Sequence, residues 1–278
     1  MNFSLFANIH KDSNGDFLKQ VTTYLKSIGA NVIHDEIVTK GGFFDVSKLK
    51  NTDMIITLGG DGTLLDMAQK TKNTGIPLVG INLGSVGFLT QIEKRNYEEM
   101  LLSIFHKEFD ISNRMTIKAD VIRNGITINS VEALNDIVIT REATGDTVEI
   151  SSYINGSYID SYNGDGIIVS TPTGSTGYQM SAGGPVSDPE ADIILVTPIC
   201  PHMMHRQTYV IKGDGLVELE VREKDFVSCY LSYDGISYNI KGNDLIRISK
   251  SDLVIKLVKI QKNPFYENLR NKIYYRGN

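Results

Sequence analysis

The hydrophobic pattern changes partway along the chain, and this change limits the folds that are open to it. Up to about residue 112, short apolar runs alternate with segments of helical spacing, a pattern typical of a parallel sheet covered by helices. From Met115 onward, apolar and polar residues alternate, and Asn124-Gly125 and Asn155-Gly156 separate such runs as hairpin turns do. We therefore predict an α/β N-terminal domain with a parallel, Rossmann-like sheet, followed by a β-rich C-terminal domain.

The same pattern predicts the limits of the two domains. Residues 1–112 form the α/β domain, residues 113–250 form the β-rich domain, and the tail 251–278 joins the first. The strands expected in the α/β domain are 3–9, 32–33, 54–58 and 77–81, with helices at 17–28 and 96–107. The later strands are expected at 147–153, 158–162, 216–221, 226–233, 245–248 and 253–260.

A glycine-rich turn with a single carboxylate follows the apolar run 54–58. In residues 59–63 (Gly-Gly-Asp-Gly-Thr), glycine allows a positive φ and a close approach of a ligand to main-chain N–H groups. A helix is expected from about Thr63, and backbone donors at a helix start can hold phosphate. Asp61 is either a base or metal ligand for such a group or simply an N-cap. The turn is neither a Walker A loop nor a dinucleotide fingerprint.

Composition excludes several classes of function. The net charge of the 278 residues is -5, which argues against a broad nucleic-acid-binding surface. No stretch approaches the roughly 20 apolar residues of a membrane span, and residues 1–6 do not resemble a signal peptide. Cys200 and Cys229 have neither disulfide nor zinc spacing. We expect a cytoplasmic protein with no nucleic-acid or membrane partner.

Residues 170–178 (Ser-Thr-Pro-Thr-Gly-Ser-Thr-Gly-Tyr) have the most unusual composition in the chain. They follow the apolar run 167–169 and precede residues 182–185 (Ala-Gly-Gly-Pro). Short hydroxyls and free N–H groups can bind ribose, amide or phosphate groups, although an ordinary surface loop has a similar composition. Because so many donors lie between two apolar runs, we favour a binding loop, which we call the Ser/Thr block.

Three further polar side chains stand out. Asn135 and Asp136 interrupt an apolar run, and such a buried pair needs partners, which a ligand or neighbouring backbone could supply. Asp165 offers another carboxylate at the start of the segment that leads to the Ser/Thr block. The histidines, including His202 and His205, have no metal-ligand spacing, and no Gly-x-Ser-x-Gly elbow supports a hydrolase. We therefore predict no metal site built by the protein alone.

Taken together, these blocks closely resemble the signature sequences of the NAD kinase family. The resemblance rests on residues 59–63, 80–84, 87–89, 135–136, 165–178, 182–185 and 197–202. The glycine block alone also occurs in diacylglycerol and sphingosine kinases, whereas its combination with the Ser/Thr block is specific. The resemblance implies an active site between an α/β and a β-rich domain, and a homodimer or homotetramer.

The resemblance also implies roles for single residues. Asp61 would contact the 2′-hydroxyl of the adenosine ribose as the base, and Phe88 would lie near the adenine. Asn135 and Asp136 would hold the nicotinamide-side ribose of the same dinucleotide. The expected nucleotide-binding set is Gly60, Gly62, Thr63, Asn82, Phe88, Asn135, Asp136, Asp165, Thr173, Ser175, Thr176, Gly177, Tyr178, Ser181 and Ala182.

Three positions depart from the family pattern. Asp136 stands where glutamate is usual, Asn163 where many members have arginine, and Ile236 where glutamine is frequent. The shorter Asp136 side chain keeps its charge but has a shorter reach. No role is transferred to Ile236.

We hypothesise that the chain transfers the γ-phosphoryl of ATP, or a phosphoryl from another triphosphate or polyphosphate, to the 2′-hydroxyl of NAD, producing NADP. NAD is then a substrate, and Mg²⁺ is expected to neutralise the triphosphate. One alternative is a lipid kinase, for which the sequence offers no basic amphipathic stretch. The other is a non-catalytic NAD(P) sensor, which would keep the Ser/Thr block without needing Asp61.

Overall fold

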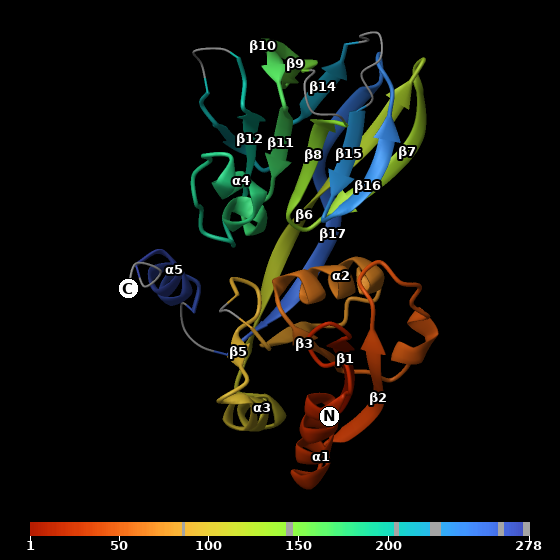
Figure 1. Cartoon of the computed structure of the whole chain (residues 1–278), viewed down its shortest axis with the longest axis vertical. Helices are drawn as coiled ribbons and strands as arrows, with labels where there is room; N and C mark the ends of the chain where they lie inside the picture. Colours follow the sequence, from red (N-terminus) through yellow and green to blue (C-terminus); the bar gives the residue numbers. More distant parts are fainter. Residues whose placement is uncertain (85–86, 143–146, 203–205, 223–228, 261–263, 275–278) are drawn as a thin grey trace. The chain divides into compact units, whose positions relative to one another are not determined.

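Two units make up the part of the chain that the computed structural model describes, residues 1–84, 87–142, 147–202, 206–222, 229–260 and 264–274 (Figure 1). The first comprises Met1–Asn113 and Ile255–Asn278, and the second Arg114–Val254. The predicted fold class is confirmed, because the first unit has a parallel sheet with helices and the second has antiparallel sheets. We also predicted that the α/β domain ends at residue 112 and that the β-rich domain ends at residue 250. Those limits, taken as the limits of domains that fold independently, stay a prediction.

The sheet of the first unit is parallel at every strand pair described. Its order is β17-β4-β3-β1-β2, with β5 beside β4. The bounds are β1 (Asn2–Asn8), β2 (Asn31–Val38), β3 (Met54–Gly59), β4 (Leu78–Asn82), β5 (Ile92–Glu93) and β17 (Leu245–Lys259). Both β3 and β4 are buried along their whole length, as expected of strands covered on both faces. The carboxyl ends of β3 and β4 lead into the predicted phosphate-binding turn and into residues 83–90.

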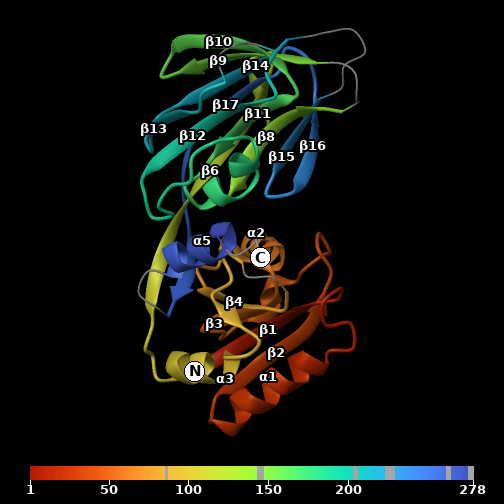
Figure 2. The same cartoon turned by 60° about the vertical axis from the view of Figure 1, so that its left-hand side comes forward.

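Helices cover both faces of this sheet (Figure 2). Helices α1 (Asp16–Ser27) and α3 (Tyr97–Phe105) lie on one face, and their apolar residues share a core with Phe3, Leu5 and Ile56. Helix α2 (Asp61–Thr71) lies over the other face. The unit also contains the 3-10 helix η1 (Val46–Leu49) and the C-terminal helix α5 (Pro264–Tyr274).

The second unit consists of two antiparallel sheets that enclose one apolar core. The first sheet joins β17 to β6 (Asp110–Arg123), β7 (Ile126–Ala133), β9 (Val148–Ile154), β10 (Ser157–Gly164) and β14 (Val217–Val221). The second has the order β13 (Tyr209–Lys212), β12 (Ile193–Ile199), β11 (Gly166–Ser170), β8 (Asp136–Arg141), β15 (Cys229–Tyr233) and β16 (Ile236–Ile240). Inward-facing residues of both sheets, such as Ile150 and Ile139, are almost inaccessible.

The predicted hairpins are confirmed. Asn124 and Asn155 have φ of 50° and 52°, each followed by a glycine with positive φ, and they join β6 to β7 and β9 to β10. Asp234-Gly235 joins β15 to β16 in the same way, with φ of 47° at Asp234. Short polar side chains and glycine tolerate this left-handed backbone, which gives tight turns between twisted strands.

Several expectations about single elements were wrong. Helix α2 begins at Asp61 rather than near Thr63, and the expected strands 245–248 and 253–260 are one continuous strand, β17. The Ser/Thr block is not a plain turn, because it forms the 3-10 helix η2 (Thr173–Thr176) and the short helix α4 (Tyr178–Ser181). Part of the expected strand 226–233 lies outside the described residues. No described helix has the length and apolar character needed to cross a membrane.

Candidate active site

The glycine turn of the first unit passes directly from β3 into α2. Gly60 is extended, with φ of -136°, and none of the turn's glycines has a positive φ, so the turn does not use the left-handed conformation that glycine allows. The helix begins at Asp61, directly after Gly60, so no left-handed residue is needed between β3 and α2. A Cβ on Gly59 would overlap the Thr63 side chain, whereas Cβ atoms on Gly60 and Gly62 would meet nothing within 4 Å.

The carboxylate of Asp61 is held by the segment that follows β4. Oδ1 accepts hydrogen bonds from the N–H of Leu89 (3.1 Å), the N–H of Thr90 (3.0 Å) and the Thr90 hydroxyl (3.0 Å). Oδ2 accepts one from the N–H of Phe88 at 2.6 Å. These donors fix the side chain at the start of α2, where the helix dipole also favours a negative charge.

Other predicted residues near the turn are engaged within the unit. The Thr63 hydroxyl accepts from Asn8 Nδ2 at 3.0 Å and is 7% exposed. The amide oxygen of Asn82 accepts the Gly84 N–H at 2.9 Å. The Phe88 ring lies against that of Phe265, with centroids 6.1 Å apart. Thr63 and Asn82 therefore shape the turn, and the Gly60 N–H donates to the Thr63 hydroxyl at 3.5 Å.

In the second unit, Asn135 and Asp136 lie at the start of β8 and are fixed through their backbone. The Asp234 carboxylate accepts the N–H groups of Leu134 (2.7 Å) and Asn135 (2.8 Å). The carbonyl of Asn135 accepts the N–H of Thr171 at 2.9 Å. These contacts orient the pair without using its side chains.

The Ser/Thr block packs on this backbone. A Cβ on Gly174 would overlap the Asn135 carbonyl oxygen, so the close approach requires glycine. The fully buried Ser175 hydroxyl accepts from the N–H of Ser187 at 3.1 Å. In contrast, Asn135 Oδ1 and Thr173 Oγ1 are buried and have no hydrogen-bond partner among the described residues. Such orphan groups are costly unless a ligand or water satisfies them.

Asp136 has an unusual electrostatic environment. Burial, together with the nearby negative charge of Asp234, raises the pKa of its carboxyl to about 7. Within the described part of the chain, no hydrogen bond to its side chain is present to stabilise the charged form. Burial also raises the pKa of the Tyr178 hydroxyl, with smaller contributions from Cys200, Asp165 and Asp136.

The remaining predicted residues lie at the surface of the same region. Asp165 Oδ1 forms an ion pair with Arg141 Nε at 2.8 Å. Tyr178 is 45% exposed. Thr176, Gly177 and Ala182 are partly buried and Ser181 is exposed. The second-unit residues of the predicted site thus lie around the start of β8, η2 and α4, except Asp165, which lies beside Arg141 at the other end of β8.

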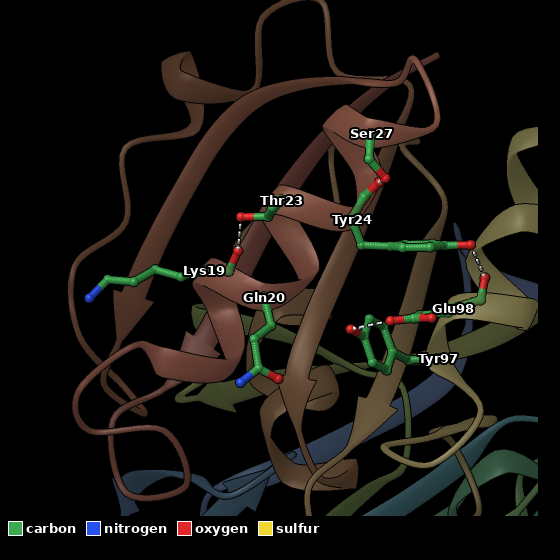
Figure 3. A pocket seen from close by; sticks show the side chains of 7 residues that line it. All are labelled: Lys19, Gln20, Thr23, Tyr24, Ser27, Tyr97 and Glu98. Atoms are coloured by element: carbon green, nitrogen blue, oxygen red, sulfur yellow. Dashed lines mark hydrogen bonds between the residues drawn. The ribbon is translucent and has the colours of Figure 1, made fainter.

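The predicted residues that the structure describes build no metal-ligand cluster. In the described ranges, no group of three or more His, Cys, Asp or Glu side chains could hold a metal ion; His205 lies outside those ranges. A hollow of about 460 Å³ lies elsewhere, between α1 and α3 (Figure 3). Its polar groups bond to one another: the Tyr24 hydroxyl donates to the Glu98 carbonyl, and that of Tyr97 to the Glu98 carboxylate. The hollow contains no predicted site residue.

Comparison with protein families gives matches to both halves of the chain. Residues 3–109 match the model of the ATP-NAD kinase N-terminal domain, and residues 134–260 match that of the ATP-NAD kinase C-terminal domain. The NAD kinase of Lachnoclostridium phytofermentans is 37% identical over 97% of this chain and 98% of its own length. That of Caldanaerobacter subterraneus is 38% identical over 96% of both.

Solved structures give the same result. A crystal structure of an NAD kinase from Archaeoglobus fulgidus in complex with ATP is 27% identical, with a TM-score of 0.79 over 97% of this chain and 99% of the other. The yeast NADH kinase complexed with NADH has a TM-score of 0.86 over 100% of this chain and 88% of the other, at 22% identity, and shows the shared fold. The chain belongs to the NAD kinase family. It is a phosphotransferase that phosphorylates NAD to NADP with ATP.

Three residues that contact the predicted site residues were not predicted from the sequence. Thr90 follows the recognised motif 87–89, Asp234 occupies a hairpin turn, and Arg141 ends β8. Only Asp234 had a usable signal, since Asp-Gly between alternating runs predicts a hairpin. Its bond to the Asn135 backbone spans 99 residues of sequence, and nothing in a local pattern indicates such a contact.

Proposed function

We propose that Asp61 is the general base of the phosphoryl transfer. Asp61 Oδ2 takes the proton of the 2′-hydroxyl of the adenosine ribose while the ribose oxygen bonds to the γ-phosphorus of ATP. The bond between that phosphorus and the β,γ-bridging oxygen breaks, ADP leaves, and the proton is later released to water. The hydroxyl is a weak nucleophile, so removing its proton as the P–O bond forms lowers the barrier.

The distribution of donors around Asp61 is the observation that carries this proposal. A carboxylate oxygen offers about two lone-pair positions. Oδ1 has three donors and is saturated, whereas Phe88 N–H is the donor to Oδ2 in the described part of the chain. Oδ2 therefore keeps a lone pair that can accept a proton. Asp61 is the first residue of α2 and Gly60 is the N-cap, so capping by Asp61 does not explain the four donors from residues 88–90.

The open N–H groups at the start of α2 are the proposed contact for phosphate. Nothing inside the unit requires Gly62 to lack a side chain, because a Cβ there meets no atom within 4 Å. A ligand that approaches the backbone closely would instead require glycine at this position. Gly60, whose Cβ would also meet open space, is proposed to allow the same close approach, although its own N–H donates to the Thr63 hydroxyl at 3.5 Å.

The second unit is proposed to bind the dinucleotide. Within the predicted set, Asn135 Oδ1 and Thr173 Oγ1 are buried and lack a hydrogen-bond partner among the described residues, and ribose hydroxyls would satisfy both. Asp136, Asp165, Thr176, Gly177, Tyr178, Ser181 and Ala182 complete the proposed contacts. Ser175 contributes through the backbone, since its hydroxyl bonds to Ser187.

Mg²⁺ is proposed to arrive with the triphosphate as part of the substrate. The described side chains form no cluster of three acidic, histidine or cysteine ligands, so phosphate oxygens and water would make up most of its coordination. There the ion neutralises the charge of the transferring group. Use of polyphosphate, a homodimer or homotetramer, and a cytoplasmic location stay predictions.

The test is incubation with NAD and Mg-ATP, read out by an NADP-specific coupled dehydrogenase. Wild type should produce NADP, and Asp61→Asn should lose most of its kcat while still binding NAD. Asp12→Asn is the matched control, because Asp12 is 8% exposed and accepts the N–H groups of Phe17 and Leu18 in the same unit. Asp61→Asn turnover within a few-fold of wild type would remove Asp61 from the base role.

A further inference from the structure

Among the described residues, Thr90 is the one whose side-chain hydroxyl donates a hydrogen bond to the Asp61 carboxylate. Among the described residues, the other donors to that carboxylate are backbone N–H groups, which no substitution removes without altering the loop. The Thr90 hydroxyl donates to Oδ1 at 3.0 Å, and its own N–H donates to the same oxygen at 3.0 Å. Thr90 thus binds Asp61 twice, once through a group that can be changed by mutation.

Two glycines fix how the Thr90 side chain is turned. A Cβ on Gly80, in β4, would overlap Thr90 Cγ2, so the methyl group lies directly on the strand. A Cβ on Gly87 would overlap both Thr90 Oγ1 and Asp61 Oδ1. Thr90 is 3% exposed, and exchanging its methyl and hydroxyl positions would place the methyl group against Asp61 Oδ1 and lose the hydrogen bond. The hydroxyl is therefore held toward Asp61 by packing.

We propose that Thr90 is the positioning residue of the reaction: it binds Oδ1 of Asp61 and so presents Oδ2 to the acceptor hydroxyl. This inference rests on the proposed role of Asp61 as the base. Proton transfer requires the base within hydrogen-bond reach of the proton, so a small rotation of the carboxylate slows the chemical step. Binding of NAD does not depend on that rotation.

The Val and Ser variants separate the hydroxyl from the methyl group. Thr90→Val keeps the shape but places a methyl group against Oδ1, and it should lower kcat about 10- to 100-fold, the range for losing a hydrogen bond to a charged group. The KM for NAD should stay within about 2-fold. Thr90→Ser keeps the hydroxyl and should stay within about 3-fold of wild-type kcat.

Thr71→Val is the matched control for losing a buried threonine hydroxyl. Thr71 is 2% exposed, lies on the same helix as Asp61, and donates its hydroxyl to the Met67 carbonyl at 2.7 Å. This variant should lose stability with unchanged kcat. If Thr90→Val does not fold, Thr90→Ala replaces it, and Ser must still exceed Ala in kcat.

A double-mutant cycle with Asp61→Asn distinguishes the outcomes. Thr90→Val added to Asp61→Asn should lower the residual turnover no further, because Thr90 acts through the Asp61 carboxylate. An equal further loss would overturn the inference, as would a Ser variant as slow as Val. Thr90→Val with normal kcat beside an inactive Asp61→Asn would overturn it and leave the base role standing. A fully active Asp61→Asn would instead refute the proposed function.

Discussion

Asp61 in the first unit and Asp136 in the second are both predicted site residues, and the environments of their carboxylates are opposite. Asp61 accepts four hydrogen bonds from residues 88–90. Asp136 is partly buried near Asp234, and no donor within the described residues bonds to its side chain. The first acid is held in one place before any substrate arrives, as a catalytic group must be. The second lacks partners, which a bound sugar would provide.

The same contrast separates the neutral groups of the two units. Thr63 and Asn82 near Asp61 have partners inside the first unit. Asn135 Oδ1 and Thr173 Oγ1 near Asp136 do not. We therefore propose that the preorganised groups of the first unit serve the chemical step and that the unsatisfied polar groups of the second serve binding. Variants that change one function without the other test this division.

Asp61→Asn should have the largest effect. The amide cannot accept the proton from the ribose, so kcat should fall by about 10²- to 10⁴-fold, the usual contribution of general-base catalysis. The Kd for NAD, measured by titration calorimetry, should stay within about 3-fold. A loss that appears in the Kd rather than in kcat would move Asp61 from chemistry to binding.

Thr173→Val and Ser175→Ala should give opposite results within one short helix. Thr173 Oγ1 has no hydrogen-bond partner among the described residues, so replacing it with a methyl group should not lower the free energy of unfolding, while the Kd for NAD should rise about 10-fold. Ser175 bonds to Ser187, so Ser175→Ala should cost about 1 kcal/mol of stability with an unchanged Kd. Denaturant titration and calorimetry measure both quantities; the reverse pattern would exchange their roles.

Asp136 should make stability depend on pH. Its pKa is raised to about 7 in the folded state by burial and by Asp234, against about 3.9 in the unfolded chain. Between these values the folded state keeps a proton that the unfolded state has released. The free energy of unfolding should therefore fall as pH rises from about 4 to about 7.

Asp136→Asn removes this titration. Denaturant unfolding at pH 5 and at pH 8 should show the variant gaining stability relative to wild type at the higher pH. Asp234→Asn should weaken the pH dependence of stability, because the negative charge of Asp234 no longer raises the pKa of Asp136. Parallel pH profiles for wild type and Asp136→Asn would show that the raised pKa is not real.

Asn268→Ala should have the smallest effect. Asn268 Nδ2, on α5, donates to the carbonyl of Gly87 at 3.3 Å, beside the residues that hold Asp61. Water can replace a long, partly exposed hydrogen bond, so kcat should change by less than about 3-fold. A loss of tenfold or more in the coupled assay would make α5 part of the catalytic support and weaken the contrast between the units.

The sequence predicts features that depend on local pattern, and it misses those that depend on distant contacts. The strand, the glycine turn and Asp61 are contiguous, and the Asn-Gly hairpins need only two residues. The donors to Asp61 come from residues 88–90, however, and Asp234 holds a backbone about 100 positions earlier. A distant contact also explains why β17 was predicted as two separate strands. Ser251 breaks the apolar pattern, yet it is buried because its hydroxyl bonds to Glu132 at 2.6 Å.

Single-turnover kinetics of Asp61→Asn and Asp136→Asn, with NAD and Mg-ATP in a quenched-flow instrument, test the division of roles most directly. The rate of the chemical step and the Kd for NAD are obtained from the same data. The account predicts that Asp61→Asn slows the chemical step with a nearly normal Kd, and that Asp136→Asn raises the Kd while leaving the step close to wild type. A normal chemical step in Asp61→Asn would contradict it.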